Sequence, residues 1–172
     1  MQILIIEDSQ SMAQALSEIL QQQGHQTTWL FGVQSLTPFV GSLKDGTTVP
    51  VDLSAFDLVF QDGDLVGSPF QGVDIVKALA CQGVKFAANS TMPDLNNEMV
   101  SLGALVAACK PVMMVALQAG AITAQGITSD TKASKDTLAQ LQATKKANKL
   151  YAEAWQAVET RLKELMKIEF GL

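Results

Sequence analysis

The chain has 172 residues, of which 48% are hydrophobic and 17% charged, and its formal net charge is −5. This length suits one domain with an appendage and excludes two full enzyme domains, while the apolar content excludes a chain that is disordered throughout. Residues 1–125 carry four lysines and eleven acidic residues, whereas residues 126–172 carry eight basic and six acidic ones. The acidic first part argues against direct nucleic-acid binding, which needs clustered Lys and Arg.

The chain shows no sign of secretion or membrane insertion. Cys81 and Cys109 lack any metal-type spacing, and two isolated thiols suit a reducing compartment. A basic segment and cleavage site typical of a signal peptide are not seen at the start. The apolar stretch 102–123 is interrupted by Lys110 and Pro111, which favours a buried strand followed by a helix over a membrane span. We expect a cytoplasmic protein.

Short apolar runs alternate with amphipathic segments along the first part of the chain. The apolar runs predict five buried parallel strands, at 2–6, 26–31, 57–61, 84–89 and 104–109. Apolar residues at helical spacing predict helices at 11–23, 73–80, 93–101 and 111–119. The Gly- and Pro-containing segment 32–56 predicts one short helix near 33–40 and a hairpin turn at 44–46.

The C-terminal part has a different character. Residues 123–134 are polar and predict a linker, and residues 135–170 contain no Gly or Pro and predict one helix of about 50 Å at 1.5 Å per residue. An apolar stripe runs along this helix, formed by Leu150, Ala154, Val158, Leu162, Leu165 and Ile168. Because a long apolar stripe is rarely left exposed, we expect the helix to mediate a homodimer or to dock a partner.

Five strand–helix units predict an α/β fold with a doubly wound, five-stranded parallel sheet. The functional site of such a sheet lies outside the carboxyl ends of its strands. Side chains that could carry chemistry fall at four predicted strand ends: Glu7 and Asp8, Asp62 with Asp64, Ser90, and Lys110.

Clustered carboxylates raise one another's pKa unless a cation lies among them, and such oxygen ligands suit Mg²⁺. A carboxylate nucleophile, a metal ion, a hydroxyl and an ammonium group together suit phosphoryl transfer.

Four sequence pieces carry a family resemblance: Ile5-Ile6-Glu7-Asp8-Ser9, Phe56-Asp57-Leu58-Val59-Phe60-Gln61-Asp62, Ala87-Ala88-Asn89-Ser90 and Ala108-Cys109-Lys110-Pro111. In this order, at strand ends, they resemble the receiver domain of two-component response regulators, the CheY-like family, over residues 1–122. The resemblance implies strand order 2-1-3-4-5 and a phosphoacceptor signalling protein, not an enzyme in its own right.

The resemblance also implies roles for the residues at the strand ends. Asp62 matches the phosphoacceptor, and Asp8 matches the direct Mg²⁺ ligand. Glu7 matches the outer acid that holds a metal-bound water, and the backbone carbonyl of Asp64 matches the third protein ligand.

Ser90 resembles the hydroxyl residue that turns toward the phosphoryl group, and Lys110 resembles the ammonium group that pairs with it. The phosphoryl donor implied by the resemblance is a sensor histidine kinase or a histidine phosphotransfer protein.

Three departures from the family stand out. Val66 replaces the usual proline after the phosphoacceptor, the segment 32–56 is enlarged, and Ala107 stands where an aromatic switch residue is usual. Ala107 motivates an alternative function, a receiver-like interaction module that does not depend on phosphorylation.

Asp62-Gly63-Asp64 also resembles the nucleophile motif of haloacid-dehalogenase phosphohydrolases. That family has a further acidic pair after the lysine, whereas here no acid follows Lys110 until Asp130. It would also leave Glu7 and Asp8 unexplained, so it is the third hypothesis.

Overall fold

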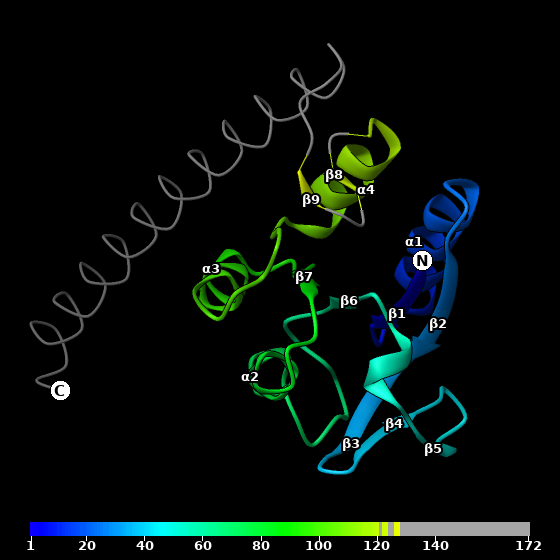
Figure 1. Cartoon of the computed structure of the whole chain (residues 1–172), viewed down its shortest axis with the longest axis vertical. Coiled ribbons are helices and arrows are strands. Elements are labelled where there is room, and N and C mark those ends of the chain that lie inside the picture. The colour runs from blue at the N-terminus through cyan, green and yellow to red at the C-terminus, as the bar shows by residue number, and fades with distance from the viewer. Residues whose placement is uncertain (121, 124–125, 128–172) are drawn as a thin grey trace, which may run out of the picture.

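The computed structural model describes residues 1–120, 122–123 and 126–127 (Figure 1). The linker predicted over 123–134 lies largely outside the described residues, and the helix predicted over 135–170 lies wholly outside them. Both stay predictions.

A parallel sheet of four strands forms the centre of the fold, in the order β2-β1-β6-β7. The strands are β1 (Gln2–Ile6), β2 (Gln26–Leu30), β6 (Leu58–Gln61) and β7 (Phe86–Ala88). Four of the five residues of β1 are buried, as expected for a central parallel strand that is covered on both faces. The first four positions of the predicted strand order are therefore confirmed.

The fifth strand, predicted over 104–109, is reduced to a single parallel bridge between Ala88 and Ala107. Backbone hydrogen bonds around this bridge join Leu105 N–H to Phe86 O and Ala108 N–H to Ala88 O. The predicted strand lies between Gly103, whose φ is 103°, and the start of helix α4 at Lys110. The parallel sheet thus has four strands, and a single bridge stands in place of the predicted fifth strand.

Among the described residues, helices α1 to α4 cover the two faces of the sheet (Figure 1). Helices α1 (Gln10–Gln22) and α4 (Lys110–Gln118) pack with one core cluster, which includes Leu16 and Met113. Helices α2 (Gly72–Cys81) and α3 (Pro93–Ser101) pack with the other core cluster. These four helices lie where the apolar periodicity predicts them.

The strand residues alternate between the two core clusters. Ile3 and Ile5 of β1 belong to the cluster under α1 and α4, whereas Leu4 and Ile6 belong to the cluster under α2 and α3. This alternation follows from the two-residue repeat of a strand. In β1 and β6, the polar side chains that follow the apolar residues lie at the carboxyl ends.

A three-stranded antiparallel sheet, here called the meander, replaces the short helix predicted near 33–40. It consists of β3 (Gly32–Leu36), β4 (Phe39–Ser42) and β5 (Thr48–Pro50). The helix prediction was wrong because Pro38 separates two short runs, each long enough for a strand but not for a helix. The meander is followed by the 3-10 turn η1 (Leu53–Ala55).

The hairpin turn predicted at 44–46 joins β4 to β5. Gly46 adopts a φ of 84°, and the Asp45 carboxylate accepts the Thr47 N–H at 2.9 Å. Val33 and Phe39 of the meander are buried in the core cluster under α2 and α3. The meander thus covers part of the sheet face that those two helices leave open.

The described chain ends in a small hairpin of β8 (Ile122–Thr123) and β9 (Gly126–Ile127), which follows α4. Among the described residues, no helix is both long and apolar enough to cross a membrane.

Candidate functional site

Two buried carboxylates lie side by side at the carboxyl end of the sheet. Strand β1 ends at Ile6 and β6 ends at Gln61, and these two residues are register partners. Glu7 follows β1 and Asp62 follows β6, so the two residues are neighbours at the edge of the sheet. The Asp62 N–H donates to Ile6 O at 3.0 Å. Glu7 is 1% exposed and Asp62 is 3% exposed.

Lys110 bridges these two carboxylates. Its Nζ lies 2.6 Å from Glu7 Oε1 and 2.7 Å from Asp62 Oδ2, and the whole residue is buried. Lys110 is the first residue of α4, so the crossing from β7 to α4 carries its side chain back over the ends of β1 and β6. Lys110 lies 103 positions from Glu7 and 48 positions from Asp62 in the sequence, and the three residues form one hydrogen-bonded group.

Burial and hydrogen bonding shift the pKa values of these three residues in opposite directions. Burial raises the pKa of Glu7 to about 7, against the lowering effect of its hydrogen bond with Lys110. Burial likewise raises the pKa of Asp62, again against the Lys110 hydrogen bond. Burial alone would lower the pKa of Lys110, but its hydrogen bonds to Asp62 and Glu7 raise it. Lys110 is therefore a permanent cation at neutral pH, and it neutralises one of the two acids.

Asp8 adds a third carboxylate to the group, here called the acid cluster (Glu7, Asp8 and Asp62). Each of the three contributes an oxygen atom, and these atoms lie within 4.8 Å of one another. The Oε2 atom of Glu7 is buried and has no hydrogen-bond partner among the residues that the structure describes. An oxygen-only donor set with surplus negative charge fits Mg²⁺, and the residues that would hold it are those of the acid cluster.

Ser90 lies against the backbone next to Asp62. A Cβ atom on Gly63 would lie 2.7 Å from Ser90 Oγ, so the hydroxyl sits directly beside the residue that follows Asp62. Ser90 Oγ accepts the Met92 N–H at 3.1 Å, which leaves the hydroxyl proton available for another acceptor. Ser90 itself is fully buried.

Asp64 is the least integrated of the predicted site residues. It is exposed, and its N–H donates to Asp62 Oδ1 at 3.4 Å. That hydrogen bond places its backbone next to the acid cluster, but the role predicted for its carbonyl stays a prediction.

Sequence reasoning missed two residues that hold the site in place. Asn96 of α3 is buried; its Oδ1 accepts the Ser90 N–H at 3.0 Å, and its Nδ2 donates to Ser90 O at 2.8 Å. A polar residue between Leu95 and Met99 on the inward stripe of α3 was the available signal. Trp29 of β2 donates from Nε1 to Glu7 O at 2.7 Å, and nothing in the sequence marks that contact.

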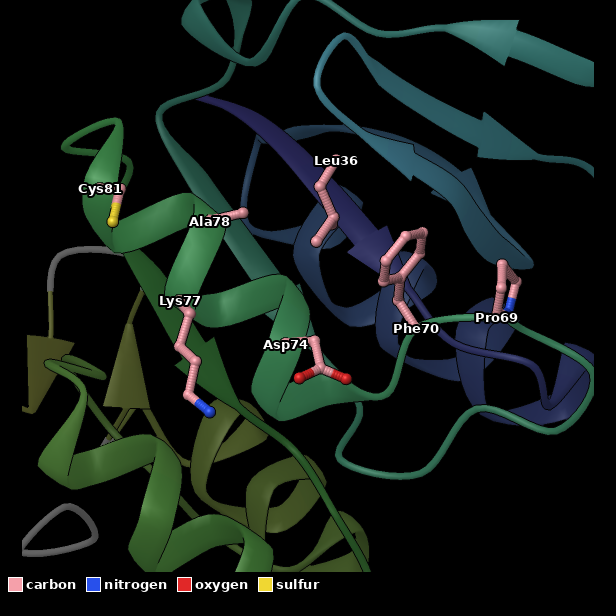
Figure 2. A pocket seen from close by; sticks show the side chains of 7 residues that line it. All are labelled: Leu36, Pro69, Phe70, Asp74, Lys77, Ala78 and Cys81. Carbon is pink, nitrogen blue, oxygen red and sulfur yellow. The ribbon is translucent and has the colours of Figure 1, made fainter.

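A groove of about 570 Å³ opens elsewhere, between α2, the end of β3 and the loop from β6 to α2 (Figure 2). Leu36, Phe70 and Ala78 give it an apolar floor, and Asp74 and Lys77 stand at its side. No residue of the acid cluster lines it, so the groove has no part in the chemistry of that cluster.

The comparisons with known proteins bear on the fold. No protein-family model and no curated protein matches the sequence. The crystal structure of the receiver domain of NtrX from Brucella abortus is 22% identical over 67% of this chain and 90% of that chain, with a TM-score of 0.51. The non-phosphorylated HemR receiver domain from Leptospira biflexa is 21% identical over 64% of this chain and 82% of that chain, with a TM-score of 0.48. The fold, on the strength of the first, is that of a CheY-like receiver domain.

Proposed function

We propose that this chain is a receiver that accepts a phosphoryl group on Asp62. The observation that carries the proposal is the Lys110 ammonium, hydrogen-bonded to the Glu7 and Asp62 carboxylates, with Asp8 close by. Burying an ion pair costs desolvation free energy that the attraction between the charges often does not recover. A buried cation in contact with a buried carboxylate at a strand end therefore supports a functional role for the pair. The donor would be a sensor histidine kinase or a histidine phosphotransfer protein, through its phosphohistidine.

The chemistry follows from where these groups lie. An Asp62 carboxylate oxygen attacks phosphorus, the P–N bond to the donor histidine breaks, and the histidine nitrogen leaves with the bonding electron pair. A Mg²⁺ ion bound at the acid cluster would neutralise charge on the phosphoryl oxygens. Lys110 already contacts Asp62, so its ammonium is placed to pair with a phosphoryl oxygen once the acyl phosphate has formed.

Ser90 would stabilise the product. Its Oγ accepts the Met92 N–H, and its proton is free to be donated to a phosphoryl oxygen. Asn96 fixes the backbone of Ser90 at both the N–H and the carbonyl, which limits its movement to the side-chain rotamer.

The test is labelling with acetyl phosphate and Mg²⁺, followed by intact mass. We expect one acid-labile phosphoryl group on the wild-type chain and none on Asp62→Asn. The matched control is Asp64→Asn, which changes an exposed acid two residues away and should keep the label. Unchanged labelling of Asp62→Asn would contradict the assignment, whereas loss of activity in both variants would favour the phosphohydrolase hypothesis, in which both acids act.

Ala107 favours one alternative, an interaction module that does not depend on phosphorylation. It is half-buried, pairs with Ala88 and has no ring that could change rotamer on phosphorylation. If the label forms but amide resonances change only around residues 62–66 and 90–92, the signal does not reach the outer surface and the alternative gains support.

Self-association through residues 135–170 is a further part of the proposal and rests on the apolar stripe in the sequence. Light scattering on the full chain and on a chain ending at Gly126 tests it. We expect a dimer for the full chain and a monomer for the shorter one, and a monomeric full chain at tens of micromolar would contradict it.

A further inference from the structure

The loop between β6 and α2 supplies a backbone donor to the acid cluster. The Val66 N–H donates to Asp8 Oδ2 at 2.8 Å. Val66 is 74% exposed, so its contact with the acid cluster is made by the backbone and not by a packed side chain. A carboxylate that accepts a fixed N–H on one oxygen has a fixed orientation, and the direction of its other oxygen is then set as well.

This donor is a property of this chain. In the family that the sequence resembles, a proline is usual at the position of Val66, and proline has no N–H to donate. The departure noted in the sequence therefore has a structural counterpart, because it creates a hydrogen bond to the carboxylate expected to ligate Mg²⁺ directly.

The loop is held so that this N–H points at Asp8. Ser68 Oγ donates to Val33 O at 3.0 Å and accepts the Val33 N–H at 3.3 Å, so one side chain satisfies both backbone groups of a β3 residue. On the other side of Val66, Leu65 is fully buried and its N–H donates to Gln71 Oε1 at 3.0 Å. Val66 is thus fixed from both sides, by the core and by the meander.

We propose that the Val66 N–H, aimed by the Ser68–Val33 contact, positions Asp8 as a metal ligand, which makes Ser68 a positioning residue and β3 a functional part of the metal site. The inference rests on the proposed function, since it takes the acid cluster to bind Mg²⁺. Partners of a ligating group that lie one contact away from the metal commonly change its affinity by about 10- to 100-fold.

The main experiment measures Mg²⁺ affinity by calorimetry and by amide chemical shifts, with no phosphoryl donor present. Val66→Pro removes the N–H, and Val66→Ala keeps it while removing the exposed side chain. We expect about tenfold weaker Mg²⁺ binding for Val66→Pro and wild-type binding for Val66→Ala. Equal affinities for the two variants would overturn the inference and leave the proposed function standing. Failure of the wild-type chain to bind Mg²⁺ would overturn both.

A second set of variants covers the case in which Val66→Pro does not fold. Ser68→Ala should weaken Mg²⁺ binding, and Ser68→Thr should restore it. Ser35→Ala should leave it unchanged, because Ser35 lies in β3, which Ser68 contacts, but its side chain forms no hydrogen bond with another described residue. Unchanged Mg²⁺ affinity of Ser68→Ala, or an equal loss of affinity in Ser35→Ala, would show a merely structural role of Ser68 and overturn the inference.

Discussion

The acid cluster with Lys110 and the meander flank the loop between β6 and α2, and they differ in the kind of side chain that they bury. On one side, the acid cluster and Lys110 bury charge at the ends of parallel strands. On the other side, the meander buries apolar residues such as Val33 and Phe39 and carries no buried acid or lysine among its described residues. The first region costs stability in return for chemistry, and the second contributes stability without chemistry.

The contrast has a consequence for the loop. A cluster of like charges holds its geometry only if its surroundings fix it, because the charges themselves repel. The loop contacts the acid cluster through the Val66 N–H and the meander through Ser68 Oγ. Packing of the meander can therefore fix the geometry of the acid cluster.

The largest expected effect comes from the cation of the charged region. Lys110→Met keeps most of the side-chain volume but leaves Glu7 and Asp62 buried without their cation, which should cost about 3–5 kcal/mol of unfolding free energy at pH 8. Urea unfolding measures it, with Lys77→Met, an exposed lysine of α2, as the control of near-zero effect. A loss below about 1 kcal/mol would mean that the buried pair is not an energetic unit.

A matched change in the meander should cost less and respond differently to pH. Val33→Ala removes apolar volume from a fully buried position and should cost about 2 kcal/mol. Because no charge is involved, this cost should be the same at pH 8 and pH 5.5, whereas the cost of Lys110→Met should shrink as the acids become protonated. Equal pH dependence of the two variants would remove the distinction between the regions.

The pKa of Glu7 predicts a pH dependence of its own. Since the folded-state pKa is raised from its ordinary 4.5 to about 7, the folded chain binds a proton that the unfolded chain does not hold between these pH values. Unfolding free energy of the metal-free chain should therefore rise as pH falls from 8 to 5, by about 1–2 kcal/mol, and Glu7→Gln should flatten this slope. Partial burial lowers the pKa of His25, which acts in the opposite direction. This contribution is the same in the wild-type and Glu7→Gln chains, so it cancels in the difference between their pH profiles.

The smallest expected effect belongs to Asp8, the least buried member of the acid cluster. Its charge contributes to the raised pKa of Asp62, so Asp8→Asn should raise the melting temperature of the metal-free chain by a few degrees, equivalent to less than about 1 kcal/mol. The same variant should lose Mg²⁺-dependent stabilisation. A destabilised variant that still binds Mg²⁺ normally would show that Asp8 is structural.

The acid cluster could be predicted because its signal lies in residue type and chain order. Glu7 and Lys110 each follow an apolar run directly, Asp62 follows one after Gln61, and the carboxyl ends of parallel strands meet at one edge. The same pattern predicted a parallel sheet, and the family resemblance implied its strand order.

The meander could not be predicted, since its strands are three to five residues long and interrupted by glycine and proline. Runs of that length carry too few positions to separate a strand from a helical turn. The hydrogen bond from Val66 to Asp8 was invisible for a different reason, because any residue except proline offers the same N–H. Asn96 was hidden because its partner is the backbone of Ser90, which no side-chain motif marks.

The most direct test of the phosphoacceptor site is the binding of beryllofluoride, a phosphoryl mimic, together with Mg²⁺, followed by amide and ¹⁹F resonances. We predict that the wild-type chain binds beryllofluoride and Mg²⁺ together, with bound fluorine signals and amide shifts at Asp62, Ser90 and Lys110. We predict that Asp62→Asn does not bind beryllofluoride, with or without Mg²⁺. A wild-type chain that gives no bound fluorine signal at saturating Mg²⁺, or an Asp62→Asn chain that gives the same signal as wild type, would contradict the account.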